Sequence, residues 1–97
     1  MIERNANALA VSGVMLNGNA TALLEAGRGL LRASEKAADL RIDLSAVTET
    51  DASALAVVFA WLRTGKENGV ALRIAGLPAS MVSQAKLYGV FEALPLA

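Results

Sequence analysis

The chain has 97 residues, with nine lysines and arginines against nine aspartates and glutamates, and it contains neither cysteine nor histidine. This length allows one domain, over residues 1–97, with a single core. Hydrophobic residues make up 55% of the chain and charged residues 19%, which excludes a disordered polypeptide. One tryptophan, one tyrosine and two phenylalanines are the only aromatic residues, so the core must consist mainly of aliphatic side chains.

The missing residue types exclude several kinds of chemistry. Because the chain has no cysteine, it can form neither a disulfide scaffold nor a thiolate. Because it has no histidine, it lacks the commonest general base and the commonest transition-metal ligand. We therefore assign no catalytic residue, no metal site and no cofactor. A net charge of zero argues against a nucleic-acid partner. The longest apolar stretch, residues 52–62, is about half a membrane span. We expect a cytoplasmic binding module that does not insert into the membrane.

In the N-terminal third, residues 8–12 and 14–16 predict two short strands, or a bent pair, separated by Gly13. Asn17–Gly18 is usually a hairpin signal, but the pattern that follows is helical, so we expect these residues to begin a helix. That helix is predicted over residues 21–33, where apolar residues recur at spacings of three and four.

In the middle of the chain, residues 40–44 alternate with period two and predict a strand, followed by a polar connection over residues 45–51. Asp51 is a good N-cap for a helix that runs over residues 52–67 and ends at Asn68–Gly69.

Residues 70–75 predict the last strand. Pro78, at a first helical position, opens a third helix that extends to Leu87 and is closed by Gly89. The apolar residues of the tail are expected to pack onto the domain; they are Phe91, Leu94 and Leu96. The order strand, strand, helix, strand, helix, strand, helix predicts a small α/β domain with a mixed β-sheet and helices packed largely on one face.

The predicted helix over residues 52–67 is apolar on two sides. One apolar stripe contains Leu55, Val58, Phe59 and Leu62 and should face the core. Val57 and Trp61 point nearly the opposite way. Either a neighbouring helix covers this second stripe, or it is an exposed protein-binding surface with Trp61 as its anchor. We favour the exposed surface. A homodimer through the Trp61 patch is a further expectation.

The start of the same helix carries a hydroxyl beside an acid. On residue types alone, Asp51 is a plain cap and Ser53 an incidental neighbour. A phosphate on Ser53 would lie at the positive end of the helix dipole, where added negative charge is tolerated. Asp51 would oppose that phosphate, and no arginine lies within this segment to pair with it.

These residues also carry a resemblance to a known family. Residues 42–47 read I-D-L-S-A-V and residues 50–55 read T-D-A-S-A-L. Together they resemble the signature of STAS domains, in which a strand ending in D-L-S is followed by D-S-S-G-L at a helix start. Residues 85–90, A-K-L-Y-G-V, resemble the branch formed by the STAS subunits of Mla phospholipid ABC transporters.

The resemblance implies the STAS fold and a non-enzymatic adaptor that docks on a transporter ATPase, which in turn binds a membrane permease. Such a protein lies in the cytoplasm, at the inner membrane only through its partners. The resemblance also implies an alternative: an anti-sigma factor antagonist, controlled by a serine kinase that phosphorylates Ser53. Ala52 replaces the first hydroxyl of the motif and Ala54 replaces its glycine. The predicted partner-binding residues are Asp51, Ala52, Ser53, Ala54, Val57 and Trp61.

Overall fold

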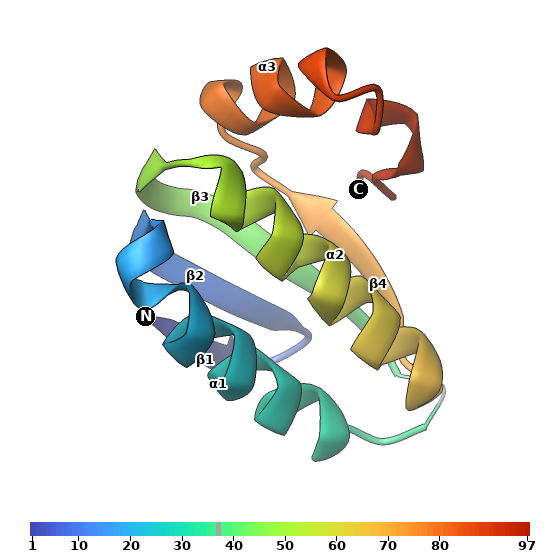
Figure 1. Ribbon diagram of the computed structural model, residues 1–97. Coiled ribbons are helices and arrows are strands. Elements are labelled where there is room, and N and C mark those ends of the chain that lie inside the picture. Colours follow the sequence, from blue (N-terminus) through green and yellow to red (C-terminus); the bar gives the residue numbers. More distant parts are fainter. Residues whose placement is uncertain (37) are drawn as a thin grey trace.

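The computed structural model describes residues 1–36 and 38–97, and its core is a four-stranded mixed sheet (Figure 1). The strands lie in the order β1-β2-β3-β4; β1 is antiparallel to β2, whereas the other neighbours are parallel. Their bounds are Ile2–Asn5 for β1, Ala8–Met15 for β2, Asp39–Thr50 for β3 and Ala71–Ala75 for β4.

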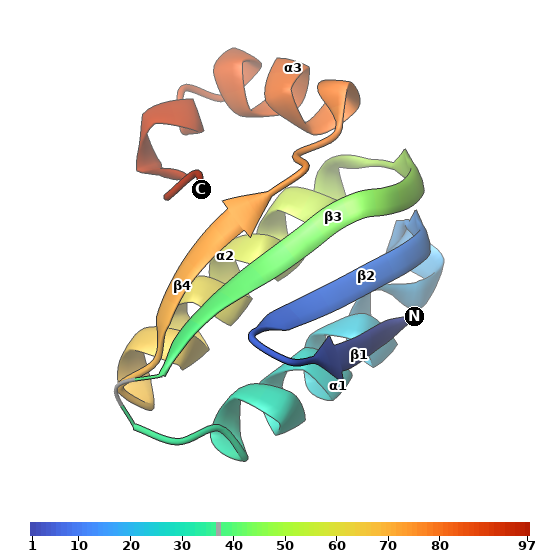
Figure 2. The ribbon, with the colours of Figure 1, turned by 180° about the vertical axis from the view of Figure 1, so that it is seen from behind.

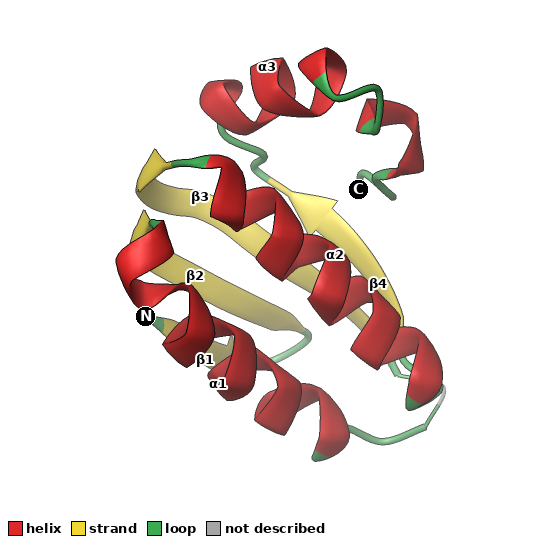
Figure 3. Cartoon of the chain, viewed as in Figure 1, coloured by secondary structure: helices red, strands yellow, loops and turns green. Residues whose placement is uncertain are grey.

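Two long helices, α1 (Ala20–Arg32) and α2 (Ala52–Glu67), cover one face of the sheet. The third helix, α3 (Ala79–Leu87), lies beyond the carboxyl ends of β3 and β4 (Figure 3). Short 3₁₀ turns, η1 (Asn17–Asn19) and η2 (Phe91–Ala93), precede α1 and follow α3. Seen from behind, none of the described helices covers the opposite face of the sheet (Figure 2). The predicted fold class, a mixed sheet with helices largely on one face, is confirmed.

The core follows from strand alternation. Along β4 and the first halves of β2 and β3, every second residue is apolar and points toward α1 and α2. These side chains are buried against apolar residues of the two helices. The strand residues concerned are Leu9, Val11, Leu40, Ile42, Leu44, Leu72 and Ile74.

All three predicted helices are confirmed. The structure begins and ends α1 one residue earlier than predicted, and it gives α2 the predicted bounds with Asp51 at its N-cap. Asn17–Gly18 does begin a helix, because η1 leads directly into α1. Pro78 stands at the N-cap of α3 and not at its first helical position, and Gly89, with φ of +71°, follows the helix end.

The strand predictions were less accurate. No strand was predicted over Ile2–Asn5, yet β1 pairs with β2 at the edge of the sheet. The two short strands predicted around Gly13 are one strand, in which Gly13 takes a φ of +81° and the register with β3 shifts. The predicted polar connection over residues 45–51 was wrong: β3 continues to Thr50 because the second half of β2 pairs with it.

The C-terminal tail packs onto the outer edge of β4. The N–H of Ile74 donates to the carbonyl of Pro95 (2.8 Å), and the N–H of Ala97 donates to the carbonyl of Ile74 (2.8 Å). Leu94 is buried and Phe91 half-buried, as predicted. Leu96 is 45% exposed, so the prediction is wrong for this side chain, although its backbone forms a bridge with Ile74.

Candidate functional site

The candidate site lies at the start of α2, and the carboxylate of Asp51 organises it. Its Oδ1 accepts a hydrogen bond from the backbone N–H of Ser53 (2.9 Å), which caps the helix. Its Oδ2 accepts one from the backbone N–H of Asn17 (2.8 Å). The backbone N–H of Asp51 donates to the carbonyl of Met15 (3.3 Å). One side chain therefore ties the first turn of α2 to the segment that joins β2 to α1.

The hydroxyl of Ser53 takes part in the same arrangement. It is half-buried and donates a hydrogen bond to Oδ1 of Asp51. This bond, with the bond from the N–H of Asn17, lowers the pKa of Asp51 below its ordinary value of 3.8. Asp51 is therefore ionised at neutral pH. A phosphate on Ser53 would lie at a helix N-terminus and, at the same time, against this carboxylate.

A pair of hydroxyls flanks the helix start. Thr50 at the end of β3 and Ser80 in the first turn of α3 share a hydrogen bond between Oγ1 and Oγ (2.6 Å). The bond joins α3 to the strand that leads into α2. Thr50, Ser80 and Asn17 were not predicted as members of this region. Their partners lie 30 or more residues away in the chain, and no local pattern signals such a contact.

The structure contradicts the prediction that Val57 and Trp61 form an exposed surface. Val57 is 5% exposed and Trp61 is fully buried. The indole of Trp61 packs against Gly27 of α1, and its Nε1 donates a hydrogen bond to the carbonyl of Leu24 (3.2 Å). The other interpretation, a neighbouring helix that covers this stripe, is therefore correct. The patch on which the predicted homodimer rested is inside the fold.

A different stripe of α2 remains accessible. Ala52 and Ala56 are exposed and Ala60 is half-buried, at intervals of four residues along one side of the helix. We call these three residues the alanine stripe. Phe59 lies half-buried beside it. Ala54, which was predicted to contact a partner, is buried. Of the six predicted partner-binding residues, Asp51, Ala52 and Ser53 are accessible.

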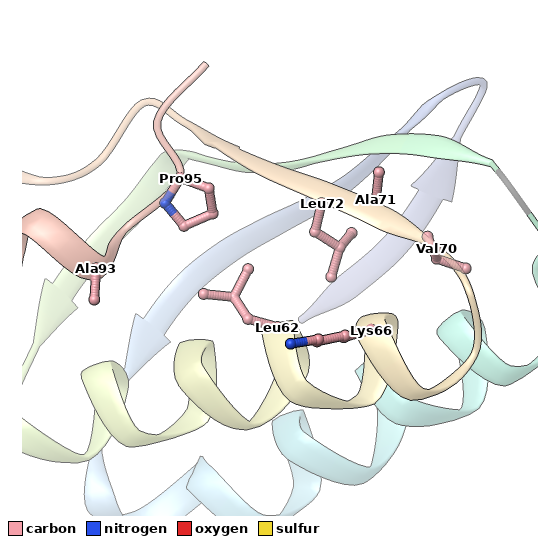
Figure 4. Close-up of a pocket in the computed structure, with 7 residues that line it drawn as sticks. All are labelled: Leu62, Lys66, Val70, Ala71, Leu72, Ala93 and Pro95. Carbon is pink, nitrogen blue, oxygen red and sulfur yellow. The ribbon is translucent and has the colours of Figure 1, made fainter.

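A shallow groove of about 360 Å³ lies at the opposite end of α2 (Figure 4). It is bounded by Leu62 and Lys66 of the helix, by the start of β4 and by Ala93 and Pro95 of the C-terminal segment. Lys66 is its only side chain with a charge. The groove is remote from Asp51 and offers no pair of groups for acid–base or nucleophilic chemistry.

Within residues 1–36 and 38–97, no three acidic side chains lie close enough together to hold a metal ion. None of the helices there is long and apolar enough to cross a membrane.

Comparison with solved structures places the fold among known proteins. An anti-sigma factor antagonist from Mycobacterium paratuberculosis is 27% identical, with a TM-score of 0.69 over 99% of this chain and 81% of that one. The anti-sigma factor antagonist SpoIIAA, in its unphosphorylated form, is 11% identical, with a TM-score of 0.67 over 99% and 84% of the two chains. Mglu is 21% identical with a TM-score of 0.59; the match covers 81% of this chain but only 19% of Mglu.

Comparison by sequence identifies the family. No curated protein matches the chain. A family model described as "Mlab, STAS domain" matches residues 1–95, which include the capped helix start and the whole sheet. The chain therefore belongs to the STAS domain family.

Proposed function

We propose that this protein is a non-enzymatic adaptor that binds and regulates the cytoplasmic ATPase subunit of an Mla-type phospholipid ABC transporter, a system that maintains the lipid asymmetry of the outer membrane. The observation that carries the proposal is the match of the Mlab family model to residues 1–95. The protein acts in the cytoplasm and reaches the inner membrane through the ATPase and its permease. It needs no cofactor, and no residue is given a catalytic role.

The docking surface we propose is the alanine stripe of α2 with the accessible residues at the helix start. Small side chains leave the helix backbone open to close approach by a partner helix, while half-buried Phe59 adds apolar contact area. Asp51 and Ser53 form the polar rim of this surface. Val57 and Trp61 contribute indirectly: they are buried, and their packing against α1 fixes the orientation of α2 and so of the docking surface.

Affinity purification tests the proposal. The tagged protein is recovered from detergent-solubilised cells of its own source, and the bound proteins are identified by mass spectrometry. We expect an ABC ATPase with its permease. Ala56→Asp places a charge in the centre of the alanine stripe and should abolish recovery. Ala22→Asp, the same change at an exposed position on α1, is the matched control and should retain it. Recovery of an anti-sigma factor or a serine kinase instead would contradict the proposal.

The alternative function is that of an anti-sigma factor antagonist switched by phosphorylation of Ser53. Two observations favour it: the similarity to the antagonist from Mycobacterium paratuberculosis, and the hydroxyl of Ser53 beside the carboxylate of Asp51. A phosphate there would repel Asp51 and weaken its cap bonds, which changes the first turn of α2. Incubation with the cognate kinase and ATP, followed by intact mass measurement, decides the point. Unmodified protein argues against the switch, and Ser53→Ala identifies the site if a phosphate is added.

A further inference from the structure

We draw no further inference here: the strongest candidate, the shallow groove between the C-terminal half of α2, the start of β4 and the C-terminal segment, carries none because nothing in the described structure shows what covers it.

Discussion

The indole of Trp61 lies directly against the backbone of Gly27, where α1 packs on α2. A Cβ atom at position 27 would overlap the indole ring, so only glycine allows this approach. The ring is fully buried, and its Nε1 is satisfied by the carbonyl of Leu24. The packing of the two helices that cover the sheet therefore includes an aromatic side chain that requires a glycine opposite it.

Replacement of Trp61 should destabilise the fold instead of removing a binding surface. Trp61→Ala leaves a large cavity between α1 and α2 and should lower the free energy of unfolding by about 3–5 kcal/mol. Trp61→Phe keeps most of the volume and should cost less, about 1–2 kcal/mol. Urea denaturation followed by circular dichroism measures both. The wild-type fluorescence should show the blue-shifted emission of a buried indole; a red-shifted emission at the start of the titration contradicts this packing.

Replacement of Gly27 or Gly29 of α1 by alanine should change the stability of the protein in opposite directions. Gly27→Ala forces a Cβ into the ring of Trp61 and should destabilise by about 1–3 kcal/mol, although alanine favours helices. Gly29→Ala meets nothing within 4 Å and should stabilise by about 0.5–1 kcal/mol. Thermal unfolding of the two variants compares them directly. If both substitutions stabilise the protein, α1 and α2 are not in the contact described.

The contribution of the α2 N-cap to the stability of the fold should depend on pH, because the cap is the carboxylate of Asp51. Its folded-state pKa lies below the ordinary value of 3.8, because it accepts hydrogen bonds from Ser53 and from the N–H of Asn17. The charge therefore stabilises the fold above about pH 4, and this contribution is lost as the pH falls through the folded-state pKa. Asn is an equally good cap without the charge, so Asp51→Asn should lack this part of the pH dependence.

Denaturant titrations of the wild type and Asp51→Asn between pH 2 and 7 measure the effect. Asp43 also has a lowered pKa, from its hydrogen bonds with Ser45, but it titrates in both proteins and cancels in the difference. The stability advantage of the wild type should shrink toward low pH. An advantage that stays constant or grows on acidification would mean that the carboxylate does not hold the cap as described.

Much of the fold follows from local patterns in the sequence. Strand β4 alternates strictly and Asp51 marks the start of α2, so these two elements were predicted almost to the residue, whereas only the buried first half of β3 was recognised. Strand β1 was missed because Ile2 is its only residue that packs on the core, and the rest is polar edge. The second half of β3 reads as a polar loop because its partner, beyond Gly13 on β2, cannot be recognised locally.

The burial of Trp61 could not be predicted for a different reason. The periodicity of one helix identifies two apolar sides but does not say which is covered by another helix. A signal was present in α1, where Gly27 occupies the same face as buried Leu23 and Leu31. A glycine in such a place indicates close approach by a bulky group from elsewhere. Thr50, Ser80 and Asn17 carried no comparable signal, since their hydrogen bonds join distant segments.

The central claim is that the protein docks on a transporter ATPase through the alanine stripe. Its most direct test is an isothermal calorimetric titration of the protein with the purified ATPase subunit of an Mla-type transporter from the same cells. We expect the wild type and Ala22→Asp to bind with equal affinity and Ala56→Asp to bind at least about tenfold more weakly, because a buried unpaired charge is costly at an interface. Ser53→Ala should bind like the wild type. Absence of binding by the folded wild type, or equal binding by Ala56→Asp, would contradict the account of an adaptor that docks through the alanine stripe of α2.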